Sequence, residues 1–247
     1  MTRLRNALFA VLGLMALLPA TADAQLRWQA GRQYVVIEPA GELSVPAGRI
    51  EVTEAFSYGC IHCYRAKDEI AKLKASLPSD AVMTYLHASF IPSEGWPMLQ
   101  QAFYTAQALG VAESVHDRLF TAIWETGEFP LLDPRTGGAR KPLPTIEDAA
   151  RFYQKYAAVK PETFLATARS PKVRDAVSRA DRLVKDYKVS GTPTLVVNGR
   201  YQIRMEELSG WDEIRQLVAF LVAQERQRLK LPAPASGAPA PSAAPRG

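Results

Sequence analysis

Two cysteines separated by two residues constrain this chain more than any other feature. Cys60 and Cys63 are the only cysteines in 247 residues. The run before them, residues 50–56, predicts a strand, and the residues after Cys60 predict a helix. Two thiols at this spacing can form a disulfide with each other, and the first can also reach a cysteine of another protein. The pattern therefore predicts a redox-active dithiol that carries out thiol–disulfide exchange.

Three other uses of a cysteine pair fit the sequence less well. A structural bridge here would close a loop of four residues, which contributes about 2 kcal/mol in the chain-entropy model against about 4.7 kcal/mol for a 100-residue loop. A structural zinc site takes four Cys or His ligands, whereas the histidines of this chain are scattered, at His62, His87 and His116. Covalent haem requires His directly after the second cysteine, where Tyr64 stands. We therefore expect neither a metal nor another cofactor.

The first 24 residues have the features of a secretory signal peptide. Arg3 and Arg5 make a basic start, residues 7–18 form an apolar core, and residues 22–24 resemble a cleavage site. The core of 12 residues is shorter than the about 20 that cross a bilayer. We expect a soluble protein exported to an oxidising compartment, the periplasm of a Gram-negative bacterium.

Neither the composition of the C-terminal end nor the net charge indicates a further binding partner. Residues 232–247 are almost entirely Pro, Ala, Ser and Gly, which predicts a disordered tail. The formal charge of +5 falls to +4 when residues 1–24, with two Arg and one Asp, are removed. Because no Lys/Arg-rich run accompanies this mild charge, we expect no nucleic-acid partner.

The periodicity around the cysteine pair predicts an α/β scaffold. Strands are expected at residues 33–37, 50–56, 82–90, 194–197 and 201–203. The helix that begins at Cys60 joins the second and third strands in a βαβ unit, which implies parallel pairing. Asn198-Gly199 predicts a hairpin between the last two strands, and a final helix is expected from about Ser209.

Between residues 96 and 188 the periodicity is helical. Helices are expected at residues 97–109, 113–126, 146–156, from 161, and at 172–187. A Cys-x-x-Cys pair where a strand feeds a helix is the sequence form of a thioredoxin-like site. The sequence thus predicts a thioredoxin fold with an inserted all-helical domain. Residues 25–94 and 189–231 would form the thioredoxin-like domain, and residues 95–188 the insertion.

Residues 53–64 read Thr-Glu-Ala-Phe-Ser-Tyr-Gly-Cys-Ile-His-Cys-Tyr, and residues 189–194 read Val-Ser-Gly-Thr-Pro-Thr before a hairpin. With the helical insertion between them, these stretches resemble the DsbA family of periplasmic thiol–disulfide oxidoreductases. The resemblance implies an oxidase that donates its disulfide to exported proteins with reduced cysteines. It also implies a DsbB-like membrane partner that reoxidises the dithiol and passes the electrons to quinone.

Three positions depart from the family pattern. Ile61 stands where the best-known members have proline, and Tyr85 where a lysine sometimes pairs with a buried glutamate. Thr192 stands where oxidases often have valine and disulfide isomerases have threonine. These changes leave the reaction class unaltered and bear on the redox potential.

The cysteine segment itself predicts the roles of three residues. Cys60 is the candidate nucleophile, because a helix N-terminus and a neighbouring imidazole lower the pKa of a thiol. His62 is expected to donate a hydrogen bond or a positive charge to the Cys60 thiolate. Cys63 lies one turn into the helix and is expected to be the less exposed, resolving thiol.

Three further residues complete the candidate site. The resemblance implies that Pro193 faces the dithiol after a cis peptide bond, and that Thr192 offers its backbone to an extended substrate; a plain strand-entry proline is the alternative. Glu54, a carboxylate on an otherwise apolar strand, is expected to have a raised pKa and to exchange a proton with Cys63. Glu51 on the same strand could be the buried carboxylate instead. Four residues are expected to pack the core or the domain interface: His87, Trp96, Trp124 and Phe129.

Two other functions remain open from the sequence. An isomerase or reductase of the same exported class is indicated by Thr192, but such isomerases usually carry a dimerisation domain, for which residues 25–49 are too short. This favours a monomeric oxidase. A non-catalytic, chaperone-like binding module is the second alternative, and the intact pair of Cys60 and Cys63 argues against it.

Overall fold

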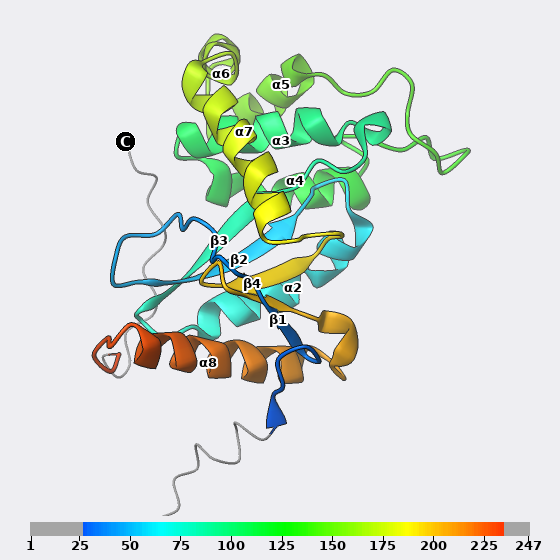
Figure 1. Ribbon diagram of the computed structural model, residues 1–247. Helices are drawn as coiled ribbons and strands as arrows, with labels where there is room; N and C mark the ends of the chain where they lie inside the picture. The colour runs from blue at the N-terminus through cyan, green and yellow to red at the C-terminus, as the bar shows by residue number, and fades with distance from the viewer. Residues whose placement is uncertain (1–26, 235–247) are drawn as a thin grey trace, which may run out of the picture.

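The computed structural model describes residues 27–234 (Figure 1). The signal peptide expected at residues 1–24 lies outside these residues, as does most of the tail expected at 232–247. None of the helices in the described range is long and apolar enough to cross a membrane.

Five strands form one mixed sheet in the order β1-β5-β4-β2-β3. The strands are β1 (Tyr34–Val36), β2 (Ile50–Phe56), β3 (Ala81–His87), β4 (Thr194–Val197) and β5 (Tyr201–Ile203). β2 and β3 pair in parallel and are joined by helix α2 (Ile61–Ser76), so the predicted βαβ unit is confirmed. The strand expected at residues 82–90 ends three residues earlier than predicted. The chain leaves the sheet after His87 and forms the 3₁₀ helix η2 (Pro92–Glu94).

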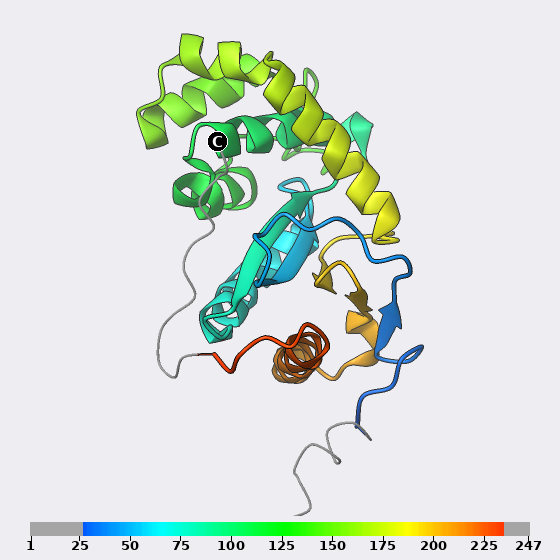
Figure 2. The same ribbon diagram turned by 60° about the vertical axis from the view of Figure 1, so that its left-hand side comes forward.

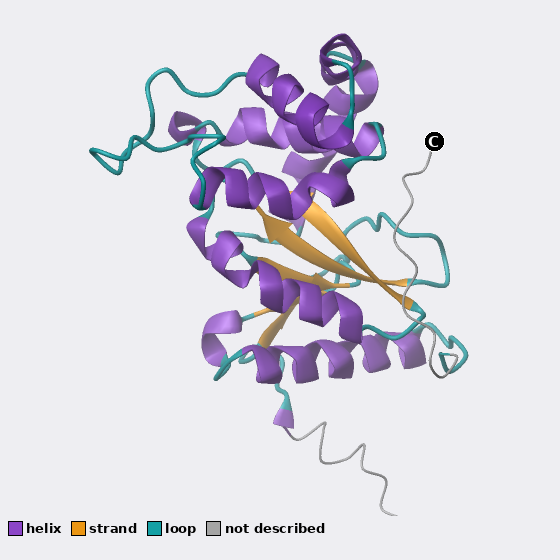
Figure 3. Cartoon of the chain, turned by 180° about the vertical axis from the view of Figure 1, so that it is seen from behind, coloured by secondary structure: helices purple, strands orange, loops and turns teal. Residues whose placement is uncertain are grey.

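Different helices cover the two faces of the sheet. Along β4, Leu195 and Val197 pack on one face and Val196 on the other, as the period of two in a strand requires. The face of Leu195 and Val197 is covered by α2 and by the last helix, α8 (Trp211–Arg228), which Figure 3 shows from behind. The face of Val196 packs against the helical insertion.

The helical insertion follows β3 and precedes β4 in the chain. It consists of α3 (Trp96–Ala108), α4 (Ala112–Trp124), α5 (Ile146–Ala157), α6 (Pro161–Ala168) and α7 (Pro171–Asp186). The predicted capping box of α5 is present, since Thr145 and Asp148 each accept the other's backbone N–H. The helices lie together on one side of the sheet, and α7 runs back toward β4 (Figure 2). The fold is therefore the predicted α/β thioredoxin fold with an inserted helical domain.

Candidate active site

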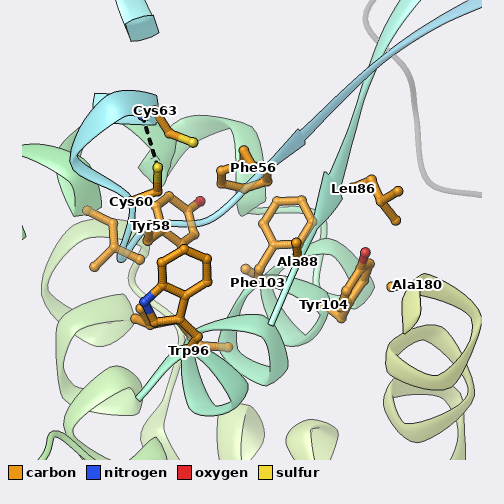
Figure 4. Close-up of a cluster of buried hydrophobic side chains, with 14 of the residues drawn as sticks. Phe56, Tyr58, Cys60, Cys63, Leu86, Ala88, Trp96, Phe103, Tyr104 and Ala180 are labelled. Atoms are coloured by element: carbon orange, nitrogen blue, oxygen red, sulfur yellow. Dashed lines mark hydrogen bonds between the residues drawn. The ribbon is translucent and has the colours of Figure 1, made fainter. Parts of the chain in front are cut away.

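A short connection between β2 and α2 places Cys60 at the start of the helix. The Cys60 N–H donates to the carbonyl of Ser57 at 3.0 Å, and Cys60 is the N-cap residue of α2. Its Sγ accepts the backbone N–H of Cys63 at 3.4 Å, the role that Ser or Asp oxygens play at other helix starts. Figure 4 shows this bond and the two sulfurs at the border of a buried cluster that includes Tyr58 and Trp96. The sulfur of Cys60 therefore lies where a helix favours negative charge.

The surroundings of Cys60 favour its thiolate. The pair is in the dithiol form, and Cys60 is 7% exposed. A hydrogen bond from the Cys63 thiol lowers the pKa of Cys60 to about 6, against an opposing effect of burial, with further help from the Thr192 side chain and from the backbone N–H groups of Cys63 and His62. At neutral pH a large fraction of Cys60 is therefore ionised and nucleophilic.

Cys63 has the opposite environment. It is 1% exposed, and burial raises its pKa, as do its hydrogen bond to Cys60 and the charge of Glu54. The two thiols thus differ strongly in acidity although they lie one helical turn apart. Such a pair can present one sulfur to a partner and hold the other back as an internal thiol.

Glu51 and Glu54 are both buried, on opposite faces of β2. Their separation by three residues requires this, because side chains alternate along a strand. Glu51 is on the side of the helical insertion, where it accepts hydrogen bonds from the N–H of Ser44 at 2.9 Å and from Oγ1 of Thr84 at 2.7 Å. Glu54 is on the side of α2, which carries Cys63.

Burial, together with a smaller effect from the charge of Cys60, raises the pKa of Glu54 to about 8. Glu54 is 3% exposed. A groove of about 1360 Å³ runs between α2, α4, α7 and β3, and both Glu54 and Cys63 line it. In the parallel register of β2 and β3, Glu54 lies opposite Tyr85 rather than a basic residue. The carboxyl group is therefore protonated at neutral pH and lies on the same groove as the buried thiol.

The loop before β4 faces the cysteine pair from the other side. The Thr192–Pro193 peptide bond is cis, as predicted. The Cys60 thiol donates to the Thr192 carbonyl at 3.3 Å, so the backbone of this loop lies directly beside the reactive sulfur. The structure thus brings Cys60, Cys63 and Thr192 into contact, with Pro193 next to Thr192 in the chain and Glu54 on the groove that Cys63 also lines.

His62 is brought only partly into this site. It is exposed in the first turn of α2, and its backbone N–H is the group that acts on the pKa of Cys60. A role for its imidazole stays a prediction.

The connection from Ser57 to Gly59 is the part of the site that the sequence did not indicate. Tyr58 is fully buried, its N–H donates to Nε2 of His87 at 3.3 Å, and its carbonyl accepts from Nε1 of Trp124 at 2.9 Å. Gly59 packs so closely on Trp96 that a Cβ there would lie 2.5 Å from the indole nitrogen. His87, Trp96 and Phe129 are buried as expected. No local sequence pattern relates His87 or Trp96 to the cysteine segment, although both contact the connection before Cys60.

No family model matches the chain. The thiol:disulfide interchange protein DsbA of Pseudomonas aeruginosa is 32% identical over 227 residues, which cover 92% of this chain and 100% of that protein. The protein of the same name from Azotobacter vinelandii is 33% identical over 196 residues, 79% of this chain and 84% of that protein. The crystal structure of the oxidoreductase DsbA from Xylella fastidiosa has a TM-score of 0.70 at 30% identity and covers 81% of this chain and 98% of that chain. Similarity over nearly the whole length of these proteins, together with a cysteine pair at the start of α2 in a thioredoxin fold, shows that the chain belongs to the DsbA family and is a thiol:disulfide oxidoreductase.

Proposed function

We propose that this oxidoreductase works as an oxidase, which donates the Cys60–Cys63 disulfide to folding exported proteins. The observation that carries the proposal is the contrast between the two thiols. The pKa of Cys60 is lowered to about 6, whereas burial raises that of Cys63. An environment that stabilises the reduced thiolate makes the corresponding disulfide a stronger oxidant.

The proposed reaction has two exchange steps. A substrate thiolate attacks Sγ of Cys60, the bond between Cys60 and Cys63 breaks, and Cys63 leaves with the electron pair. A second substrate thiolate then attacks the substrate sulfur of the mixed disulfide, and Cys60 leaves as the thiolate. The substrate loses two electrons and gains a disulfide, and this protein gains the two electrons as a dithiol.

Glu54 is the proposed proton donor for the first step. The leaving Cys63 thiolate is buried and has a raised pKa, so it needs a proton at once. A carboxyl group with a pKa of about 8 is protonated at pH 7 and can supply that proton, and the groove that both residues line allows water to restore it.

Three residues at the rim of the site are proposed to act on the substrate or the thiolate. Thr192 would offer its backbone to an extended substrate, in the manner of an added strand. Pro193, which has no N–H, would keep that substrate from pairing too tightly. The imidazole of His62 would donate a hydrogen bond or a positive charge to the Cys60 thiolate.

The cellular part of the proposal rests on family membership and on the sequence. Residues 1–24 would direct export to the periplasm, where the protein would act as a monomer. Residues 95–188 would form the inserted domain, and residues 25–94 with 189–231 the thioredoxin-like domain. A DsbB-like membrane protein linked to quinone would reoxidise the dithiol.

Two assays on one preparation test the direction of the reaction. We expect the oxidised protein to form the disulfide of a reduced two-cysteine peptide rapidly and to reduce insulin poorly in the presence of dithiothreitol. The Cys60→Ala variant is the matched control and should do neither. Efficient insulin reduction with weak peptide oxidation would instead support the reductase or isomerase that Thr192 indicates, and inactivity of the unaltered protein in both assays would support a binding module.

A further inference from the structure

Tyr58 belongs to no helix or strand, yet both polar groups of its backbone are paired with side chains from distant elements. His87, which accepts its N–H, is the last residue of β3, and Trp124, which donates to its carbonyl, is the last residue of α4. Tyr58 is 0% exposed. Because a buried carbonyl without a partner is costly, the Trp124 indole holds this peptide in one position. That peptide lies two residues before Cys60.

The end of α4 also contacts the chain on the other side of the dithiol. The Tyr64 hydroxyl donates to Oε1 of Glu125 at 2.6 Å, and the rings of Tyr64 and Trp124 stack with their centroids 6.4 Å apart. A third contact joins the Tyr58 hydroxyl to Nδ1 of His116 on α4 at 3.0 Å. One helix of the insertion is therefore bonded both before Cys60 and after Cys63.

We propose that Trp124 is a positioning residue through which the helical insertion sets the reactivity of Cys60. The inference rests on the proposed role of Cys60 as the sulfur that forms the mixed disulfide and leaves as a thiolate. The thiolate is stabilised by the Cys63 thiol and, to a smaller extent, by the N–H groups of Cys63 and His62, so its stability depends on where Sγ lies relative to the start of α2. Without the indole N–H, the Tyr58 carbonyl must move to find another donor, and the connection moves with it. In the disulfide form Cys60 is not a thiolate, so its stability does not depend on these bonds. The movement therefore destabilises the reduced form relative to the oxidised form.

The Trp124→Phe variant isolates this effect, because phenylalanine keeps a ring to stack on Tyr64 and removes only the N–H donor and part of the volume. In the reduced variant we expect the pKa of Cys60, followed by thiolate absorbance against pH, to rise by up to about one unit. The equilibrium with glutathione should shift toward the oxidised protein by up to about tenfold. Trp211→Phe, the same change at the start of α8, is the matched control and should leave both values unaltered.

The two measurements separate positioning from packing. A Trp124→Phe protein with a lower melting temperature but an unchanged Cys60 pKa and glutathione equilibrium would overturn the inference. If that variant does not fold, Tyr64→Phe removes the hydrogen bond to Glu125, the C-cap residue of α4, at an exposed hydroxyl. A smaller rise in the Cys60 pKa would support the inference, and no rise would overturn it. Failure of the proposed oxidase function would be seen differently, as an ordinary thiol pKa for Cys60 in the unaltered protein.

Discussion

Cys60 and Cys63 lie in one short segment, and their chemistry differs because different forces dominate at each sulfur. Hydrogen bonds from the helix start and the Cys63 thiol outweigh burial at Cys60, whereas burial dominates at Cys63. The difference indicates which sulfur carries the substrate. Cys60 is the better leaving thiolate, and it lies beside the loop that is proposed to bind substrate.

Substitution of each cysteine should therefore have a different result. We expect Cys60→Ala to abolish thiol–disulfide exchange, and Cys63→Ala to accumulate mixed disulfides through Cys60, since Cys63 is no longer present to displace a bound substrate from Cys60. Non-reducing gel electrophoresis of cell extracts, followed by mass spectrometry of the linked peptides, checks this. Complexes linked through Cys63 in a Cys60→Ala protein would reverse the two roles.

The buried carboxyl of Glu54 should make the stability of the protein depend on pH. Its pKa is raised from 4.5 to about 8 in the folded state, so the protonated form is favoured there and stability is lost as pH rises through this range. Replacement by Gln removes the cost of ionising a buried group. We expect Glu54→Gln to gain about 2 kcal/mol in unfolding free energy, relative to the unaltered protein, between pH 5 and pH 7.

Denaturant unfolding of the oxidised protein measures this gain without titration of Cys60. Glu206→Gln, at an exposed carboxylate, is the control and should show no such pH dependence. An equal response of both variants to pH would mean that Glu54 is ionised in the folded protein.

At the scale of elements, the connection between β2 and α2 is fixed by its neighbours. The indole of Trp96, the first residue of α3, occupies the space where a side chain at Gly59 would lie, with a Cβ 2.5 Å from Nε1 and 2.8 Å from Cδ1. We expect Gly59→Ala to destabilise the fold by about 1–3 kcal/mol, the usual cost of overpacking a rigid site. Gly138→Ala, where the nearest atom would lie 3.6 Å away, should be nearly neutral in the same denaturant titration.

The loop before β4 should control release of the substrate rather than attack. Attack by a substrate thiolate depends on access to Sγ of Cys60, which the start of α2 positions. A non-proline residue at position 193 adds an N–H next to the Thr192 carbonyl, which lies 3.3 Å from Cys60 Sγ, and so adds a donor for a bound backbone. We expect Pro193→Thr to accumulate mixed disulfides with exported proteins, seen on non-reducing gels, while Pro171→Thr at the start of α7 does not. Unchanged turnover without such complexes would make Pro193 a plain loop proline.

The sequence predicted those elements whose signals are local. Residues 50–56, the helix start at Cys60 and the capping box of Thr145 with Asp148 each lie within a few neighbouring residues, and the structure confirms them. The choice between Glu51 and Glu54 could not be made locally, because it depends on which face of β2 is covered by α2. Trp124 and Tyr58 are 66 residues apart, and the acceptor of their hydrogen bond is a backbone carbonyl. A pattern of side chains in the sequence therefore could not predict this contact.

At the scale of the whole molecule, the dithiol lies between two packed units. The sheet with α2 and α8 supplies the helix start, and the insertion supplies the residues that surround the connection before it. The relatives share this architecture over nearly their whole length, as the match to the Xylella fastidiosa structure shows. In this arrangement, we expect the folded protein to stabilise the Cys60 thiolate enough to make its disulfide an oxidant.

Two opposing effects decide whether reduction stabilises the protein. The four-residue disulfide loop favours the oxidised form by about 2 kcal/mol through the unfolded chain. The Cys60 thiolate favours the reduced form: its pKa is about 8.5 unfolded and about 6 folded, so this stability is fully present above pH 8.5 and is lost as pH falls through 6. It amounts to about 1.4 kcal/mol at pH 7 and about 2.6 kcal/mol at pH 8, so the thiolate prevails on the alkaline side.

The most direct test is the unfolding free energy of the oxidised and reduced forms, measured by denaturant titration at pH 6, 7 and 8. We expect the reduced form to gain on the oxidised form by about 1 kcal/mol per pH unit over this range and to be the more stable form at pH 8. An oxidised form that is more stable at all three pH values, by a margin that does not change with pH, would contradict this expectation.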